Sequence, residues 1–221
     1  MEQPTALAGT VRSAQLVDVP AVVRVLVGEH PAGVTPDQAE AVERVTRLML
    51  AHFGLASESV WIHDHPRDGV GAVAVAMSRE DRPDADAARR LLAREAPWHL
   101  DLLGVEQIGE GAGALAQLPD EPETLLVLAR AEPADAAGAR GADDTDGTDG
   151  TNEAADDAAA RAVAAAALAS LGDADRPVGA VSRSRHDLRV FASLGFGAGR
   201  RHLLPSGAGL WFCRRDGRPA P

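Results

Sequence analysis

The stretch RPVGAVSRSRHDLRVFASLGF, from Arg176 to Phe196, gives the clearest indication of the fold. Its first half is a run of apolar and small residues bounded by Pro and Ser, which predicts a buried strand. Its second half has apolar residues at helical spacing and ends at Gly195, which predicts a short helix with a glycine stop. A buried strand that leads directly into a helix is the basic unit of α/β folds.

A second unit of this kind lies upstream. The segment ETLLVLARA predicts another buried strand, and EAADDAAARAVAAAALASLG predicts a helix that begins at about Ala154, because alanine has the highest helix propensity. The segment between them, DAAGARGADDTDGTDGTNEAADD, begins with small residues and one arginine and then becomes acidic. We predict an acidic, disordered insertion over residues 142–157. Its carboxylates do not have the spacing of a calcium-binding loop.

The N-terminal half of the chain predicts helices and strands in alternation. A short strand lies around Val11, and a helix follows it with Asp18 as N-cap and Pro20 in the first turn. A second helix begins after Thr35 and ends at Gly54. The other predicted elements are strands in SVWIHDH and GVGAVAVAM, a helix in DADAARRLLARE, and a hairpin of AGRRHLLP with GLWFCRR. GVGAVAVAM is apolar on both faces, so we expect it at the centre of a sheet.

The expected fold class follows from this order of elements. It is α/β, a single domain with a mixed, mostly antiparallel central sheet flanked by helices. A length of 221 residues, of which 45% are hydrophobic, suits one domain with a substantial core. The net charge of −11 argues against a nucleic-acid partner, because phosphate contacts supply most of that affinity, and it suits a cationic small molecule.

The cysteine, the tryptophans and the chain start point to an ordinary globular core. Cys213 is the single cysteine and lies in the apolar segment LWFCRR, which predicts a structural thiol. Trp61, Trp98 and Trp211 lie in apolar segments, where core packing is expected and stacking on an aromatic amine is the alternative. There is no secretory signal at the start and no apolar run long enough to cross a bilayer, so we expect no membrane partner and a cytoplasmic location.

Four passages resemble the GNAT-type N-acetyltransferase family. VRSAQLVDVPAVVRVL is similar to its opening strand and helix, where an Arg-x-Ala/Ser-x-x-x-Asp pattern is usual. ERVTRLMLAHFGLASESVWI resembles the matching segment of puromycin N-acetyltransferase and its relatives. SRSRHDLRVFASLGF resembles the late Asn-x-x-x-x-Tyr-x-x-x-Gly-Phe signature, and LPSGAGLWFCRR resembles the last strand. The likeness covers a domain over residues 10–215.

This resemblance implies an acetyl-CoA-dependent N-acetyltransferase that acts on a small amine by direct transfer. The family holds the pyrophosphate of the cofactor on backbone N–H groups of a loop after the fourth strand, in a Gln/Arg-x-x-Gly-x-Gly/Ala pattern. Here Ala136 stands at the Gln/Arg position. The implied cofactor-binding residues are Leu128, Ala129, Ala131, Gly138, Ala139, Arg140, Gly141 and Asp187.

The sequence departs from the family pattern at the positions that matter most for catalysis. Asp187 stands where the family has the Asn that contacts CoA, and Phe191 replaces the Tyr that protonates the leaving thiolate. The chain has no tyrosine, so the catalytic residue stays unassigned. Because the acidic insertion repels phosphate, we expect acetyl-CoA binding to be weak or lost. The alternative function is a catalytically inactive GNAT-like scaffold that acts as a binding or regulatory module.

A second segment competes for the role of phosphate loop. HLDLLGVEQIGEGAGAL predicts a strand and then glycines at 109, 111 and 113 before a helix, with Gln107 just ahead. The glycines fit better here, but this placement leaves TLLVLARA as an extra strand. Both placements, residues 136–141 and 107–113, stay open.

Two histidines and two glutamates are the remaining candidates for a metal ligand or a general base. His63 and His65 share one face of a strand, which suits a metal ion or a general base. No third ligand accompanies them, and we expect no metal site. Glu110 and Glu123 are candidate bases by position only, and solvated carboxylates are the commoner case.

Overall fold

A computed structural model describes residues 9–28, 34–65, 69–81, 85–99, 123–131, 150–172, 176–203 and 209–217. Its elements, in chain order, are β1 (Thr10–Ser13), η1 (Leu16–Asp18), α1 (Val19–Val27), α2 (Pro36–Met49), η2 (Leu50–Gly54), β2 (Val60–His65), β3 (Gly69–Ser78), α3 (Ala85–Glu95), β4 (Thr124–Arg130), α5 (Gly150–Ser170), β5 (Val178–Ser182), α6 (Asp187–Ser193), β6 (Arg200–Leu203) and β7 (Gly209–Arg215).

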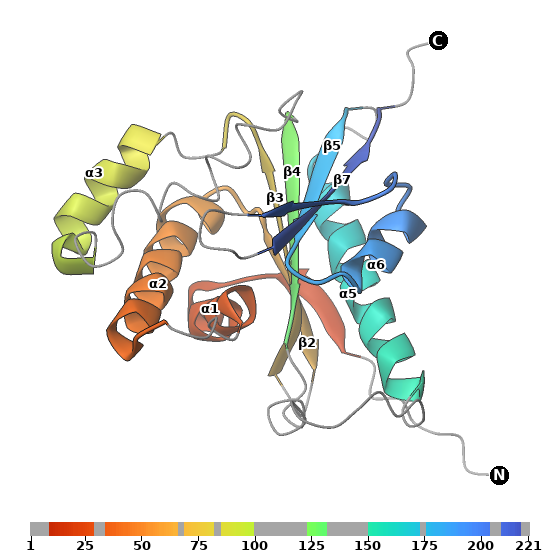
Figure 1. The fold of residues 1–221 in the computed structure, drawn as a ribbon, viewed down its shortest axis with the longest axis horizontal. Helices are drawn as coiled ribbons and strands as arrows, with labels where there is room; N and C mark the ends of the chain where they lie inside the picture. Colours follow the sequence, from red (N-terminus) through yellow and green to blue (C-terminus); the bar gives the residue numbers. More distant parts are fainter. Residues whose placement is uncertain are drawn as a thin grey trace.

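The described strands form one sheet in the order β1-β2-β3-β4-β5-β7-β6 (Figure 1). The neighbours β4 and β5 are parallel, and every other neighbouring pair is antiparallel. The predicted fold class is therefore confirmed: a mixed, mostly antiparallel sheet with helices on both faces. The predicted C-terminal hairpin is confirmed as β6 paired with β7.

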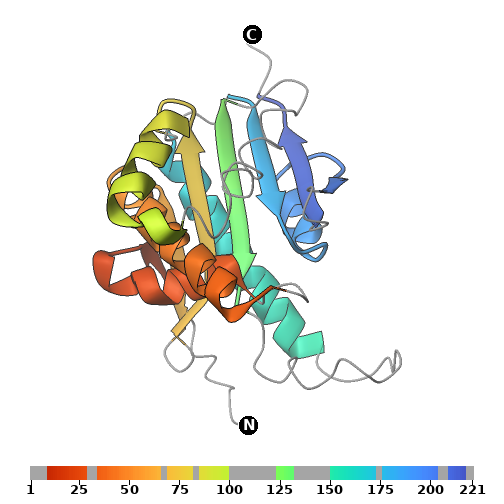
Figure 2. The same cartoon turned by 60° about the vertical axis from the view of Figure 1, so that its left-hand side comes forward.

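Helices cover the two faces of the sheet (Figures 1 and 2). On one face α1 packs against β3 and β4, α2 packs on α1, and α3 packs on α2. On the other face lie α5, which crosses β2, β3 and β4, and α6 beside β7. The sheet is thus the middle layer of a three-layer domain.

The sequence of β3 explains how both faces become core. Its alanines Ala72, Ala74 and Ala76 are buried toward α5, while Val73 and Val75 are buried toward α1. The small alanine face lets α5 approach closely with its own small residues, namely Ala160, Ala164 and Ala167. The prediction of a central, fully buried strand is confirmed, since β3 lies between β2 and β4.

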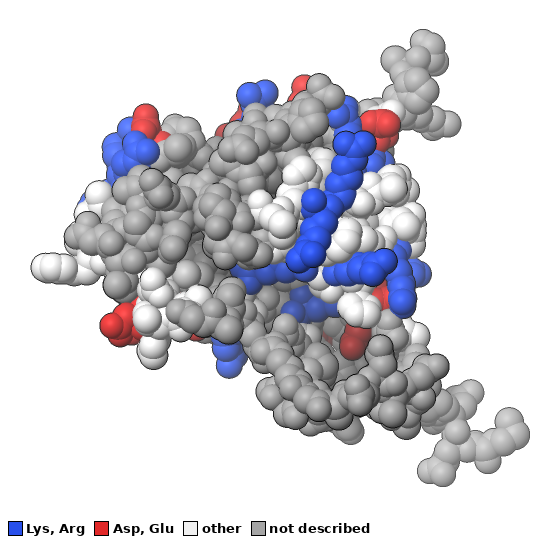
Figure 3. All heavy atoms as spheres, in the orientation of Figure 1, with Lys and Arg blue, Asp and Glu red and all other residues white. Residues whose placement is uncertain are grey.

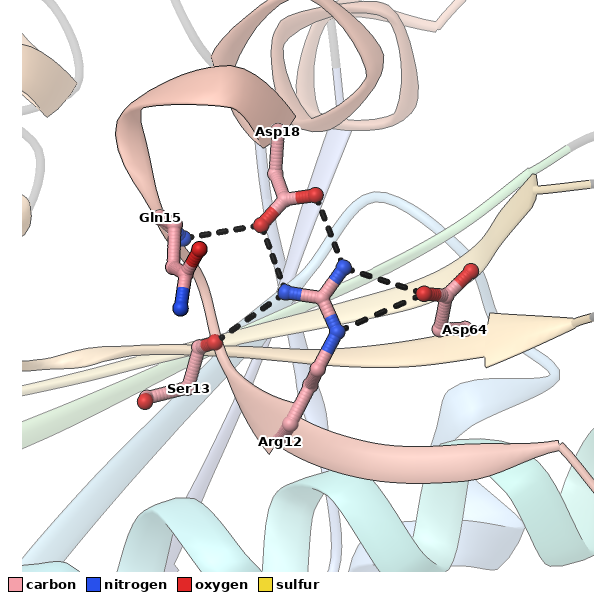
Figure 4. Close-up of polar contacts among 5 residues, drawn as sticks. All are labelled: Arg12, Ser13, Gln15, Asp18 and Asp64. Carbon is pink, nitrogen blue, oxygen red and sulfur yellow. Dashed lines mark hydrogen bonds and ion pairs between the residues drawn. The ribbon is translucent and has the colours of Figure 1, made fainter.

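An arginine clamp fixes the start of the domain (Figure 4). Arg12 on β1 donates to both carboxylate oxygens of Asp18, at 2.6 and 2.8 Å, and to Asp64 on β2 at 3.0 and 3.3 Å. The Arg-x-Ala/Ser-x-x-x-Asp pattern is therefore a structural ion pair here. The hydrogen bond from Arg12 lowers the pKa of Asp18.

The N-cap role predicted for Asp18 is only half right. Asp18 does precede α1, and Pro20 lies in the first turn, but the Asp18 side chain makes no capping hydrogen bond to that helix. It is engaged instead by Arg12 and by the backbone N–H of Gln15, at 2.8 Å. Thr35 does cap α2 as predicted, and the helical segment ends at Gly54 after a π-helical turn over Leu50–Gly54.

Two other expectations need correction. The backbone of α5 is helical from Gly150, four residues before the predicted start at Ala154, so the end of segment 142–157 belongs to this helix. Acidic residues near a helix N-terminus are stabilised by the helix dipole, so the acidic residues of this segment are compatible with the earlier start. Trp98 is 83% exposed and does not pack in the core. Among the described residues, no helix is both long and apolar enough to cross a membrane.

Candidate functional site

The parallel pairing of β4 with β5 ends before β4 does, and we call this point the separation of the two strands. The β4–β5 ladder pairs Thr124–Val127 with Val178–Val181, and Leu128–Arg130 continue beside β3 without a partner in β5. The carboxyl ends of parallel strands are where open α/β sheets bind ligands. Two residues of the sequence-predicted cofactor set, Leu128 and Ala129, lie on this part of β4, so the separation is our candidate site.

A buried charge network links the separated strands on the α5 side. Arg130 Nε lies 2.5 Å from Asp187 on α6, and Arg130 Nη1 lies 2.7 Å from Asp157 on α5. The hydroxyl of Ser182, at the end of β5, donates to the second oxygen of Asp187. The Arg130 side chain is 17% exposed and that of Asp187 is 1% exposed. The network therefore joins β4, β5, α5 and α6 through one guanidinium.

The environment of Asp187 differs from that of a surface ligand. Burial raises the pKa of its carboxyl, whereas the hydrogen bond from Ser182 and the charge of Arg130 favour the ionised form. The side chain therefore points inward and is fully engaged by the protein. Contact between Asp187 and a cofactor, which the resemblance implied, stays a prediction.

Phe191, on α6, lies in the hydrophobic core of the domain. It is fully buried and packs against Phe196, with ring centroids 5.6 Å apart and planes at 51°. The Phe side chain thus fills its site with carbon and offers no proton donor. Val190, beside it on α6, is also fully buried.

The remaining predicted cofactor residues are divided between described and other parts of the chain. Ala131 is described, and its N–H donates to the carbonyl of Gly71 at 2.8 Å, so this donor serves the β3–β4 ladder. Ala136, the implied phosphate-loop residues Gly138–Gly141 and the competing segment 107–113 with Glu110 lie outside the described residues. The structure does not choose between the two loop placements.

A second arginine, Arg183, lies at the end of β5 and contacts the helix on the other face of the sheet. Arg183, directly after β5, donates from Nη1 to the carbonyl of Val27 at the end of α1. Desolvation lowers the pKa of this guanidinium. A cation at a helix C-terminus is favourable because of the helix dipole. Near the candidate site, Arg130 thus connects the sheet to α5 and α6 on one face, and Arg183 connects it to α1 on the other face.

Sequence reasoning did not single out Arg130, Asp157, Ser182 or Arg183. A charged residue that ends an apolar strand, as in TLLVLAR, was the available signal. The partners of Arg130 lie 27 and 57 residues away in the chain, so no local pattern identifies them.

The two histidines lie away from the separated strands. His63 pairs with Ala72, which pairs with Arg130, so His63 is two strands, or about 10 Å, from Arg130 across the sheet. Burial, followed by the charge of His65, lowers the pKa of His63. Within the described ranges, no group of three or more His, Cys, Asp or Glu residues is placed to hold a metal ion. Glu123 precedes β4 and lies at the opposite end of that strand.

The other aromatic and thiol candidates have structural surroundings. Trp61 is partly buried against the α5-side core, and the guanidinium of Arg185 lies 6.0 Å from the Trp211 ring centroid. Cys213 is buried, and burial raises its pKa to about 11. The prediction of a structural thiol is confirmed by this burial.

Charge is unevenly distributed over the surface. Figure 3 shows arginine side chains gathered over the region of the C-terminal strands, where β6 and β7 contribute Arg200, Arg201, Arg214 and Arg215. The chain as a whole has a net charge of −11. Arg201 lies beside Trp211, which pairs with Ser182 near the candidate site, whereas Arg214 and Arg215 pair with Gly179 and Val178 at the other end of β5.

Comparisons with known proteins give matches among solved structures. No family model and no curated protein matches the chain. The structure described as histone acetyltransferase HPA2 and related acetyltransferase from Corynebacterium glutamicum matches with a TM-score of 0.54 and 17% identity, covering 96% of this chain and 98% of that one. An N-acetyltransferase from Staphylococcus aureus matches with a TM-score of 0.51 and 11% identity, covering 93% and 99%. From the strand order, the helices on both faces and these matches, we conclude that the chain has the fold of the GNAT-type acetyltransferases.

Proposed function

We propose that the protein is an acetyl-CoA-dependent N-acetyltransferase that transfers the acetyl group directly to a small amine. The observation that supports it most is the separation of β4 from β5 after Val127 and Val181, in a fold shared with acetyltransferases. We further propose, from the sequence passages alone, a relationship to puromycin N-acetyltransferase and action in the cytoplasm.

The residues at the separation suit the extended arm of the cofactor. Within the described part of the chain, the backbone of Leu128–Arg130 has no partner on the β5 side, and this edge suits the amide groups of a linear ligand. Arg130 Nη2 is buried and has no hydrogen-bond partner among the described residues, which leaves a donor for a carbonyl oxygen. Acetyl-CoA bound here would supply an activated thioester carbonyl to the amine.

The surroundings are less suited to the phosphates. Asp156 and Asp157 lie in the second turn of α5, close to the end where the helix dipole attracts anions. Each carboxylate near a pyrophosphate costs on the order of 1 kcal/mol even in a high dielectric. We therefore expect the nucleotide half of the cofactor to bind weakly. We also expect a water molecule to protonate the leaving thiolate.

A non-catalytic binding or regulatory module is the second candidate. It is supported by the engagement of the Asp187 carboxylate with Arg130 and Ser182, and by the buried Phe191, which has no hydroxyl to protonate a thiolate. Both candidates share the fold and differ in whether acetyl-CoA binds productively.

Calorimetric titration with acetyl-CoA separates the two candidates. A dissociation constant in the micromolar range, with release of free CoA in the presence of amines, supports the enzyme. No heat at millimolar acetyl-CoA rules the enzyme out and leaves the binding module.

Titration with acetyl-pantetheine and two charge variants tests the placement of the cofactor. Acetyl-pantetheine has no nucleotide, so we expect it to bind almost as well as acetyl-CoA. Asp156→Asn should tighten acetyl-CoA binding about two- to fivefold by removing a nearby negative charge. The matched control Asp216→Asn, on an exposed residue after β7, should have no effect. Equal effects of the two variants would show that the nucleotide does not approach α5.

A further inference from the structure

A pocket lies at the other end of the sheet from the candidate acetyl-transfer site. It has a volume of about 350 Å³ and lies between the C-terminal end of α5, the start of β2 and the end of β3. Ser78 in its wall pairs with Thr124, the first residue of β4, whereas Arg130 is the last. The two sites are thus separated by the length of β4, or about 20 Å.

Most of the serine hydroxyl groups in the pocket wall can only accept hydrogen bonds from a ligand. Of the five serines in its wall, four donate their single hydroxyl hydrogen to an acceptor of the protein itself. The pairs are Ser57 with Phe53 at 2.9 Å, Ser59 with Gly54 at 3.0 Å, Ser78 with Asp81 at 2.6 Å and Ser170 with Ala167 at 2.8 Å. A hydroxyl whose hydrogen is engaged has only lone pairs left for a ligand. The wall therefore attracts N–H donors.

The charged residues that line the pocket, among those that the structure describes, are both acidic. Glu58 and Asp81 line it, and none of its lining residues is Lys, Arg or His. The last turn of α5, which reaches the pocket at Ser170, contains no basic residue, so the negative end of this 21-residue helix is not neutralised from within the helix. Both features favour a cation in the pocket.

Trp61 adds an aromatic wall and an unsatisfied donor. An indole ring attracts an organic cation through its electron-rich face. The Nε1 atom of Trp61 is buried and has no hydrogen-bond partner in the described ranges, so a ligand oxygen would satisfy it. Glu58 has a φ of +52°, and it is the one non-glycine residue of the described chain with positive φ. Such backbone strain recurs at ligand sites.

We propose that this pocket binds a small organic ammonium ion that also carries a hydroxyl group, such as an amino alcohol. The ammonium group would be held by Glu58, Asp81 and the serine oxygens beside the Trp61 ring. The hydroxyl oxygen would accept from Trp61 Nε1. The site does not depend on acetyl transfer, because it shares no residue with the separated ends of β4 and β5.

The test follows the indole N–H resonances of the protein by ¹H–¹⁵N NMR. The chain has three tryptophans, and the spectrum of Trp61→Phe identifies the Trp61 signal by its loss. The probe is 5-aminopentan-1-ol, and pentane-1,5-diol is its uncharged counterpart. We expect the Trp61 signal to shift saturably with the amine at about millimolar concentration, and not with the diol. An equal response to the diol, or no shift of Trp61, would overturn the proposal.

Charge variants test the assigned residues. Glu58→Gln and Asp81→Asn should each weaken binding of the amine about tenfold, as expected for loss of a hydrogen bond to a charged group. Glu80→Gln is the matched control, since Glu80 is an exposed neighbour of Asp81 outside the pocket wall, and should bind as the unmodified protein does. Should Asp81→Asn disturb the turn at Ser78, Glu58→Gln still decides: binding unchanged in that variant would refute the assignment.

Discussion

Replacing Arg130 with methionine is the most direct test of the network at the candidate site. The substitution removes the ion pairs to Asp157 and Asp187 and leaves the 1% exposed Asp187 carboxylate with the Ser182 hydroxyl as its remaining partner. Removing one partner of a buried pair destabilises by about 3–5 kcal/mol. We expect about 3 kcal/mol, the lower end of this range, because Ser182 still donates to Asp187.

Urea unfolding followed by circular dichroism measures this change. A loss of about 3 kcal/mol corresponds to a fall of about 1 M in the urea midpoint for a chain of this size. Arg89→Met is the matched control, because Arg89 forms an ion pair with Asp86 in which the side chains are 57% and 71% exposed. Exposed pairs contribute about 0–1 kcal/mol, so this variant should unfold almost as the unmodified protein does.

The pH dependence of the Arg130→Met effect has a definite sign. Burial already raises the pKa of Asp187, and removing the nearest positive charge raises it further. A carboxyl whose pKa is higher in the folded state takes up a proton there first, which removes the buried charge. The stability difference between Arg130→Met and the unmodified protein should therefore narrow as the pH falls from 7 to 5.

Two outcomes would refute this reasoning. One is a loss for Arg130→Met no larger than that for Arg89→Met, which would mean that Asp187 is not a buried charge. The other concerns the double variant Arg130→Met with Asp187→Leu, which removes both charges and should recover most of the lost stability. A double variant as unstable as the sum of the single variants would contradict the proposed pairing.

Three further outcomes are expected. Phe191→Tyr places a hydroxyl in a fully buried site, so it should lower the unfolding free energy by about 1–3 kcal/mol and give no gain in acetyl transfer; a stable and more active variant would contradict this placement. Cys213, buried and with its pKa raised to about 11, should resist a thiol reagent at pH 8 until the protein is unfolded, as a colorimetric thiol assay with and without urea can measure. Arg12→Met should lower the free energy of unfolding by about 1 kcal/mol at pH 7. Because Arg12 lowers the pKa of Asp18, this contribution is present above the unfolded pKa of the carboxyl, near 4, and is lost as the pH falls below it. Thermal unfolding should therefore show a smaller effect of the substitution at pH 3 than at pH 7.

Periodic features of the sequence were sufficient to predict the fold. The alternation of alanine and valine in β3 identifies a strand buried on both faces, because each face needs its own apolar set. The Thr35 cap was also predictable, since a cap and the N–H that it accepts are three residues apart. Both predictions depend on residues close together in the chain, and the structure confirms both.

The charged contacts of the site were not predictable in the same way. The resemblance put Asp187 at a cofactor-contacting position, but its partner Arg130 is 57 residues away in the chain and becomes a neighbour only when β4 and β5 pair. Asp18 had the right position for a cap, and Arg12 outcompetes the helix for its carboxylate. The start of α5 lies at Gly150, four residues before the predicted Ala154, because alanine propensity does not include the favourable effect of acidic residues on a helix N-terminus.

The two outer strands of the sheet have a consequence for behaviour at high concentration. β1 and β6 are each four residues long, with the sequences TVRS and RRHL, and neither contains a fully buried residue. Short, charged outer strands are poor templates for pairing with a second molecule, because a neighbour gains few hydrogen bonds and must approach arginine side chains. We therefore expect the folded protein to resist edge-to-edge aggregation, even though its inner strands are rich in valine and alanine.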